Sequence, residues 1–204
     1  GSGEAWIEGK SDSSRWDFSG SGKHKQFGAT TRSGDSSWSV LMTRHVDQYA
    51  IATDPVRRFV NDPGRLAREQ PARGLIRKGD RNMLSDEHPL ITYRFPSRND
   101  DSRTLIATAL PAVGYLYSTG YAHGVLHPEG TSVRRKLALL GYINSLVADW
   151  WARRFVDRHV GSRVINGLPL PEWTEVQIAE VASCVQELLA RGGLKELPGG
   201  HGVS

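Results

Sequence analysis

The second half of the chain carries the clearest hydrophobic periodicity. From Ser132 onward, apolar residues recur at steps of three, four and seven, which is the spacing of one face of an α-helix. A Leu-Pro-Leu-Pro break follows, after which Thr174 and Gln177 occupy the positions of a capping box at the start of a second helix. Gly192 and Gly193 predict the end of that helix. The two apolar stripes comprise Val133, Leu137, Leu140, Ile143, Val147, Trp150 and Trp151 in the first helix, and Ile178, Val181, Ala182, Val185, Leu188 and Leu189 in the second.

The first half of the chain predicts short strands. Runs rich in aromatic and β-branched residues alternate with segments rich in Gly, Ser, Pro and charge. Asp54 and Asp62 each precede a proline and predict the caps of two short helices. Strands followed by helices indicate an α+β fold, with a mixed strand and loop region before two longer C-terminal helices. The predicted strands are Trp38–Thr43, Gln48–Thr53, Leu90–Phe95 and Arg103–Leu110, with a further one at Val113–Ser118.

The pattern divides the chain into one domain with two parts and a tail. Residues 1–3 are typical of a cloning scar, and the abrupt start at Glu4 indicates a piece of a longer polypeptide. Residues 4–131 form the strand and loop region, and residues 132–193 form a helical framework of the same domain. Residues 194–204 are expected to be a flexible tail.

Composition narrows the class of protein. The single cysteine, Cys184, excludes an internal disulfide and favours a reducing compartment. The longest nearly apolar run, Leu105–Tyr117, is about half a membrane span and contains Pro111. We therefore expect a soluble, cytoplasmic protein with no membrane partner. The net charge of +4 permits a nucleic-acid partner without requiring one.

No phosphate-binding or metal-binding motif is complete. Ser19–Lys23 resembles a phosphate loop, but Asp17 stands where a glycine is needed and His24 where a serine or threonine is needed. His123 and His127 have the four-residue spacing of helical metal ligands. A proline directly after the second histidine and several nearby glycines favour loop histidines instead.

The signals for catalysis are equally incomplete. Glu8 and Lys10 match the distal half of a nuclease motif, but only Glu4 could supply its upstream acid. A nucleophile elbow is absent, and so are the glycine-rich cofactor loop and the Asn-Pro-Pro-Tyr-type loop that amino-methylation of DNA bases requires. We therefore assign no catalytic residue, no metal ligand and no cofactor to this chain.

Several residues of the first helical stripe need a tertiary explanation. Asn144 lies among apolar positions, where a buried amide must find a hydrogen-bond partner. Gly141 costs about 1 kcal/mol of helix propensity and lets another backbone approach closely. Trp150 and Trp151 flank the stripe, because neighbouring helical residues are about 100° apart, so we expect both tryptophans in the core.

Arginines cluster in two places. Their planar guanidinium groups suit phosphates and guanine edges, which makes them candidates for DNA contacts. Between residues 132 and 164 there are seven Lys/Arg against two Asp/Glu. Part of this charge has a structural alternative, because Arg153 stands four residues from both Asp149 and Asp157. The other cluster, around a predicted strand-turn-strand unit, comprises Arg94, Arg98 and Arg103.

Three segments, in order, resemble DNA target-recognition domains of single-chain bacterial adenine methyltransferases. These are the TaqI-like specificity domains of restriction–modification enzymes and their phage-defence relatives. Trp6–Lys10 resembles an opening Glu-Gly-Lys run, and Tyr93–Pro111 resembles an Arg-rich turn followed by a strand. Ala138–Trp173 resembles the closing Leu-Gly-x-Leu-Asn-Ser helix, aromatic-basic stretch and Leu-Pro-x-Pro segment. The matching framework residues include Gly141, Asn144, Ser145, Trp151, Leu168, Pro169 and Pro171.

The resemblance implies a module that reads duplex DNA for an S-adenosylmethionine-dependent adenine methyltransferase. The catalytic domain and its cofactor then belong to the parent enzyme, with or without a fused nuclease. Loops 10–34 and 54–82 and the arginine turn are the expected contact surface. The alternative is a protein-interaction module that docks a partner subunit through its C-terminal helices. The candidate DNA-contacting residues are Lys10, Lys23, His24, Lys25, Arg32, Arg57, Arg58, Arg94, Arg98 and Arg103.

Overall fold

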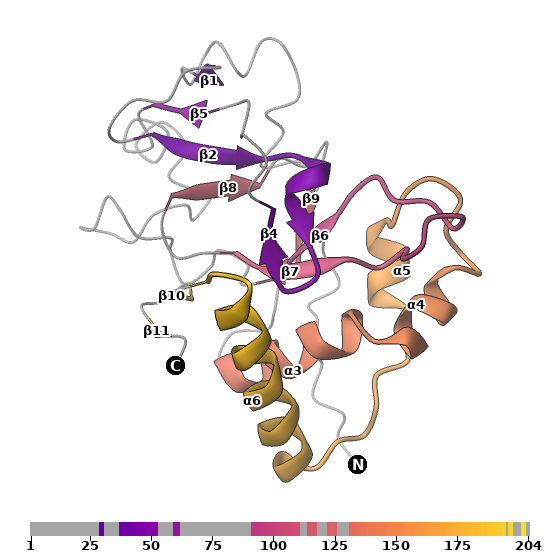
Figure 1. Cartoon of the computed structure of the whole chain (residues 1–204). Coiled ribbons are helices and arrows are strands. Elements are labelled where there is room, and N and C mark those ends of the chain that lie inside the picture. The colour runs from indigo at the N-terminus through magenta and orange to yellow at the C-terminus, as the bar shows by residue number, and fades with distance from the viewer. Residues whose placement is uncertain are drawn as a thin grey trace.

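The computed structural model describes residues 29–30, 37–52, 59–61, 91–110, 114–117, 122–125, 131–194, 196–197 and 201–202. This part of the chain combines small sheets with four α-helices, so its composition is α+β (Figure 1). The strands are β1 (Ala29–Thr30), β2 (Trp38–Leu41), β3 (Val46–Asp47), β4 (Ala50–Ile51), β5 (Phe59–Val60), β6 (Ile91–Arg94), β7 (Ala107–Ala109), β8 (Tyr115–Tyr117), β9 (Ala122–Val125), β10 (Glu196–Leu197) and β11 (His201–Gly202). The helices are the 3-10 turn η1 (Thr43–His45) and α3 (Val133–Ile143), α4 (Leu146–Ala152), α5 (Ser162–Asn166) and α6 (Glu175–Arg191).

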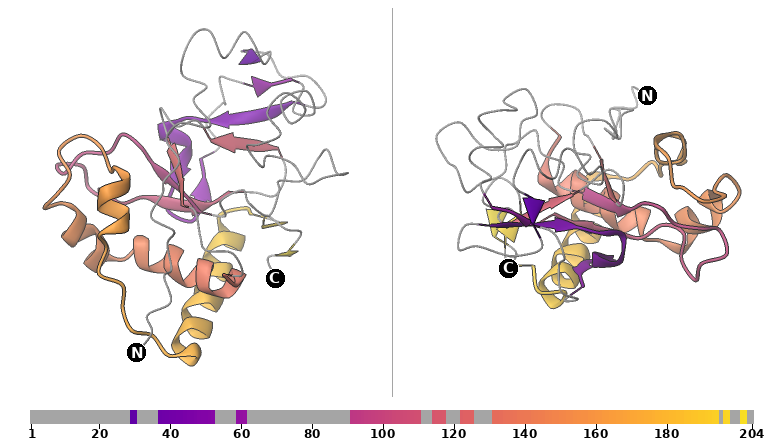
Figure 2. Two further views of the ribbon diagram at one scale, coloured as in Figure 1. Left: turned by 180° about the vertical axis from the view of Figure 1, so that it is seen from behind. Right: turned by 90° about the horizontal axis from the view of Figure 1, so that it is seen from above.

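Two sheets lie above the helices in the view of Figure 1. The upper sheet has the order β1-β5-β2-β8, in which β2 and β8 are parallel and the other pairs are antiparallel. The lower sheet is antiparallel with the order β7-β6-β9, and its register pairs Thr92 with Thr108 and with Gly124. The small β3–β4 ribbon crosses beside the lower sheet (Figure 2). β7 is therefore an outer strand of its sheet.

The predicted strands exist in shortened form. β2, β6 and β8 lie within the predicted runs, whereas the run from Trp38 to Thr43 ends in η1 because the ring of His45 accepts a hydrogen bond from the Met42 N–H at 2.9 Å. Only Ala107–Ala109 of the predicted run Arg103–Leu110 is a strand. The two short helices predicted at 54 and 62 lie outside the described residues.

The helical half differs from its prediction in one important respect. The predicted first helix is interrupted at Asn144, which ends α3, and Ser145 starts α4 as a new N-cap. The second predicted helix is confirmed as α6, including the Thr174–Gln177 capping box and its end before Gly192. A short helix that the pattern did not predict, α5, lies between them.

The core joins the lower sheet to all four α-helices. α3 packs against α6, where a Cβ on Gly141 would lie 2.9 Å from Val185 Cγ2 and 3.0 Å from Val181 Cγ1. The expected close approach at Gly141 is therefore made by side chains of α6. The largest buried residues of this core include Tyr93, Ile91, Leu105, Leu137, Leu139, Leu140 and Ile143.

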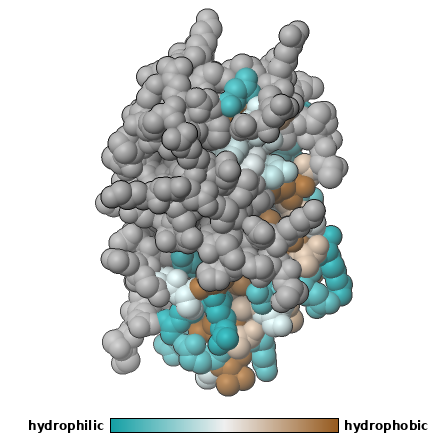
Figure 3. All heavy atoms as spheres, turned by 90° about the vertical axis from the view of Figure 1, so that its left-hand side faces the viewer, coloured by the Kyte–Doolittle hydropathy of each residue, from teal (hydrophilic) through white to brown (hydrophobic). Residues whose placement is uncertain are grey.

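The surface, the helices and the β10–β11 pair add three facts. Hydrophobic and hydrophilic side chains are interspersed over the lower part of the face shown in Figure 3. In the part of the chain that the structure describes, no helix combines the length and the apolar character that crossing a membrane requires. β10 and β11 form a two-stranded pair where the sequence predicted only a flexible tail.

A close contact ties the β3–β4 ribbon to the end of α6. Tyr49 lies at the tip of the ribbon with a positive φ of 58°, and its N–H donates to the Ala107 carbonyl at 3.1 Å. Gly192, directly after α6, faces this tip, and a Cβ there would overlap the Tyr49 carbonyl oxygen and lie 3.1 Å from Ala50 Cβ. The absence of a side chain at Gly192 therefore allows the ribbon to dock.

We predict that Gly192→Ala lowers the free energy of unfolding by about 2 kcal/mol, because backbone atoms must move to admit the methyl group. Gly161→Ala is the matched control, since a Cβ there meets nothing within 4 Å. Urea unfolding followed by circular dichroism measures both variants. Equal stability of the two variants would contradict the contact.

Candidate functional site

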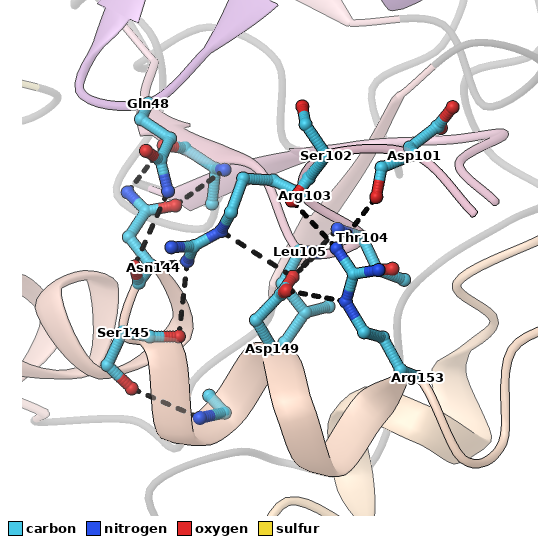
Figure 4. Close-up of polar contacts among 12 residues, drawn as sticks. Gln48, Asp101, Ser102, Arg103, Thr104, Leu105, Asn144, Ser145, Asp149 and Arg153 are labelled. Atoms are coloured by element: carbon cyan, nitrogen blue, oxygen red, sulfur yellow. Dashed lines mark hydrogen bonds and ion pairs between the residues drawn. The ribbon is translucent and has the colours of Figure 1, made fainter. Parts of the chain in front are cut away.

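The break between α3 and α4 is the centre of a polar network (Figure 4). Asn144 is the C-cap of α3, and the Ser145 hydroxyl caps α4 by accepting a hydrogen bond from the Ala148 N–H at 3.2 Å. Asn and Ser favour such positions because their short polar side chains compete with the helical backbone for hydrogen bonds. The sequence Asn-Ser therefore explains locally why one helix ends and another begins.

The side chain of Asn144 pairs with the outer edge of β7. The Ala107 N–H donates to Asn144 Oδ1 at 2.9 Å, and Asn144 Nδ2 donates to the Ala107 carbonyl at 2.8 Å. The amide thus takes the place of a neighbouring strand, and it is only 6% exposed. The expectation that Asn144 must find a partner is confirmed. Burial raises the pKa of Tyr49, although a side-chain hydrogen bond with Asn144 and the charge of Arg103 act in the opposite direction.

The backbone carbonyls at the end of α3 are bound by a guanidinium group. Arg103 Nη2 donates to the carbonyl of Asn144 at 2.6 Å and to that of Ser145 at 3.2 Å. Gln48 Nε2, from the β3–β4 ribbon, lies 3.4 Å from the same Asn144 carbonyl. The Asn144 carbonyl has no partner within α3, so Arg103 and Gln48 satisfy it, whereas the Ser145 carbonyl also accepts the Asp149 N–H of α4 at 3.1 Å. Arg103 is therefore engaged inside the protein.

Asp149, on α4, binds the backbone that precedes β7, as Asn144 binds β7 itself. It is 4% exposed, and its Oδ1 accepts hydrogen bonds from the N–H groups of Thr104 and Leu105, both at 2.7 Å. Its Oδ2 accepts from Arg153 Nε at 2.9 Å, and Arg103 Nε lies 3.7 Å from Oδ1.

These contacts act in opposition on the pKa of the Asp149 carboxyl. Burial raises the pKa, but the hydrogen bonds from Leu105, Arg153 and Thr104 and the charge of Arg103 together outweigh it. The pKa therefore lies below its usual value and the group is ionised at neutral pH.

Arg153 fixes the turn formed by residues 98–102. Its Nη1 donates to the Asn99 carbonyl at 2.7 Å, and its Nη2 donates to the carbonyls of Asp101 and Ser102 at 2.7 and 2.8 Å. Within the turn, the Arg98 N–H donates to Asp101 Oδ2 at 2.9 Å. The predicted i,i+4 pair with Asp149 is confirmed. In the described part of the chain, Arg153 makes no ion pair with the aspartate at 157.

In the cluster of Arg94, Arg98 and Arg103, the two remaining arginines differ, because Arg94 is bound inside the fold and Arg98 is exposed. Arg94 donates through Nε and Nη2 to the Val46 carbonyl at 3.2 and 2.7 Å and so joins β6 to β3. Arg98 is exposed at the start of the turn. The remaining candidate DNA contacts lie outside the described residues: Lys10, Lys23, His24, Lys25, Arg32, Arg57 and Arg58.

The framework residues of the closing element occupy structural positions. Leu168 is buried, and the Tyr142 hydroxyl donates to the Pro169 carbonyl. The Pro171 carbonyl accepts from the Trp173 N–H at 3.0 Å. Trp151 is partly buried against the core, and a Cβ on Gly167 would lie 3.1 Å from its Cη2 atom.

The expectation for Trp150 is wrong. Trp150 is 58% exposed, and Arg154 lies over its ring with the guanidinium carbon 4.0 Å from the centroid. Because α4 begins as a separate helix after Ser145, it does not continue the apolar stripe of α3. Its buried residues are Ala148, Asp149 and Ala152. Val147, which belonged to that stripe, is 65% exposed. Leu188 on α6 is also partly exposed, at 39%.

The expectation for His123 is also wrong. His123 belongs to strand β9 and not to a loop, and it is 4% exposed. Its ring stacks on Phe95 at a centroid distance of 4.1 Å, and its Nδ1 lies 3.3 Å from the Tyr93 hydroxyl oxygen. Among the described residues there is no group of three or more potential metal ligands. His127 lies outside the described residues.

Sequence reasoning missed the role of Asp149 and of the backbone at Thr104 and Leu105. The available signal was a carboxylate between the small residue Ala148 and the tryptophans, on a helix that is otherwise apolar. Such a carboxylate is seldom buried without several donors. Comparison of the chain with protein-family models, with curated proteins and with solved structures found no match.

We predict that Asn144→Ala lowers the free energy of unfolding by about 2 kcal/mol, because the buried Ala107 N–H loses its acceptor. Asn166→Ala, at an exposed position of α5, is the control and should change stability by less than about 0.5 kcal/mol. Urea titration measures both. A neutral effect of Asn144→Ala would show that another acceptor replaces the amide.

The pKa of Asp149 predicts a loss of stability in acid. Because this pKa is lower in the folded than in the unfolded state, its contribution is complete above the unfolded value of about 3.9 and is lost as the pH falls through the folded value. The difference in unfolding free energy between wild type and Asp149→Asn should therefore be large near neutral pH and shrink as the pH falls below about 3.9. Asp157→Asn, at an exposed aspartate, is the control. A difference that does not change with pH would contradict the assignment.

Proposed function

We propose that this chain recognises duplex DNA as the target-recognition part of an S-adenosylmethionine-dependent adenine methyltransferase in restriction or phage defence. The observation that carries the proposal is the turn at residues 98–102. All of these residues are exposed, and Arg153 binds three of the turn's carbonyls from the helical framework. The resemblance of three ordered segments to target-recognition domains supports it further.

The turn presents side chains that suit the edges of base pairs. Arg98, Asn99 and Asp100 stand in succession, and such side chains bind guanine, adenine and cytosine edges respectively in the major groove. Because Arg153 binds the carbonyls of Asn99, Asp101 and Ser102, recognition would use mainly the side chains of the turn. A turn that is already ordered loses little conformational entropy on binding.

The internal arginines have another role in this proposal. The guanidinium groups of Arg94 and Arg103 bind backbone carbonyls within the fold, so neither arginine is proposed to contact DNA. Phosphate contacts would come from exposed cations such as Arg98 and from the candidate lysines and arginines of loops 10–34 and 54–82. Methyl transfer and its cofactor are assigned to a catalytic domain outside this chain, which would flip the adenine out of the duplex.

We predict salt-dependent duplex binding that depends on Arg98. A target selected from random duplexes should bind more tightly at about 50 mM than at about 200 mM salt, because phosphate contacts release counterions. Arg98→Ala should weaken binding to that target about tenfold and relax its sequence preference. Fluorescence anisotropy measures both effects.

The matched control is Arg134→Ala, which removes an exposed arginine near the start of α3, far along that helix from Asn144. It should leave the sequence preference unchanged. Binding that is equally tight at both salt concentrations would refute the phosphate contacts. An Arg98→Ala protein with unchanged affinity and preference would refute the role of the turn.

A further inference from the structure

The outward side of α4 carries an unusual concentration of exposed apolar side chains. Leu146, Val147 and Trp150 are 73%, 65% and 58% exposed, and Phe155, just beyond the helix, is 62% exposed. Four of the six large hydrophobic residues exposed in the described part of the chain therefore lie between positions 146 and 155. We call these four side chains, together with Arg154, the α4 face.

The residues of the α4 face are neighbours in space as well as in sequence. Leu146 and Trp150 are one helical turn apart, and Arg154 stacks on Trp150 one turn further on. Phe155 packs against the ring of Trp151 at a centroid distance of 4.6 Å. Isolated exposed hydrophobic residues need no explanation, whereas a contiguous group marks an interaction surface.

The fold holds the α4 face in a fixed orientation. The opposite side of α4 is already buried through Ala148, Asp149 and Ala152. Asp149 binds the backbone before β7, and Arg153 binds the turn, so α4 cannot rotate to bury its outer side. A rigid surface of this kind, rich in tryptophan, phenylalanine and arginine, has the composition of an interface centre.

The charges of Arg154 and of the segment that follows the α4 face along the chain favour one kind of partner. The exposed charged side chains from position 150 to 163 are three arginines, at 154, 158 and 163, and one aspartate, at 157. A second copy of the chain would bring like charges together across a symmetric interface. DNA would pair with the arginines but would leave Leu146 and Val147 against a polar surface.

We infer that the α4 face docks a protein segment in which apolar side chains are flanked by carboxylates, an acidic amphipathic helix. Its apolar side would cover Leu146, Val147 and Trp150, and its carboxylates would pair with Arg154 and the neighbouring arginines. This inference does not rest on the proposed DNA recognition, because it uses a different surface.

The test uses two libraries of displayed helical peptides of about 16 residues. Both carry leucine or phenylalanine at the spacing of one helix face; the remaining positions are Asp and Glu in one library and Lys and Arg in the other. The intact chain should enrich the acidic library about tenfold over the basic one. The strongest peptide should bind about tenfold more weakly to Trp150→Ala and to Val147→Asp. Both positions are exposed, and thermal unfolding checks that the variants remain folded.

Two further variants sharpen the test. Val176→Ala, at a residue of α6 that is 67% exposed, is the matched control and should bind the peptide as wild type does. Arg154→Glu should shift the preference toward the basic library. Equal enrichment of both libraries, or wild-type binding by Trp150→Ala, would overturn the inference. So would a concentration-dependent dimer that Trp150→Ala abolishes in sedimentation experiments, or displacement of the peptide by duplex DNA.

Discussion

The outer backbone edge before and within β7 is satisfied mainly by side chains from a helix break, with one backbone N–H from Tyr49, and the arrangement of the helices around the strand depends on these contacts. Asn144 accepts the N–H of Ala107, and Asp149 accepts the N–H groups of Thr104 and Leu105. A buried N–H without a partner costs about 1–3 kcal/mol, so the helices are held against the strand at one position. The same contacts cover an edge that could otherwise pair with another chain.

The orientation of α4 follows from this constraint, and two surfaces follow from the orientation. With Asp149 facing the strand, Arg153 reaches the turn at 98–102, and the α4 face points outward. The turn that we propose to read DNA and the surface that we infer to dock a partner therefore share one support. A change at the buried carboxylate would affect both, whereas a change at either surface would leave the support intact.

Features that depend on neighbouring residues could be predicted from the sequence. The Thr174–Gln177 capping box, the end of α6 and the positions of β2 and β6 rest on local hydrogen bonds and on side-chain shape. The ion pair of Asp149 with Arg153 could be predicted because four residues make one helical turn. The three carbonyls that Arg153 also binds could not, because nothing near it in sequence indicates that turn.

By itself, the sequence determined where α6 begins and ends, and that Asn144 had to find a partner, because caps and an amide among apolar positions obey local rules. Only the tertiary structure decided which groups became partners. The backbone groups bound by Asn144 and Asp149 are 37 to 45 residues away along the chain. Packing of the whole core brings these groups together in space. The same packing fixes which side of α4 is buried, so that Trp150 is exposed and Arg103 binds carbonyls inside the fold. Hydrophobic periodicity describes one helix at a time, so it does not indicate which distant backbone groups a side chain will bind.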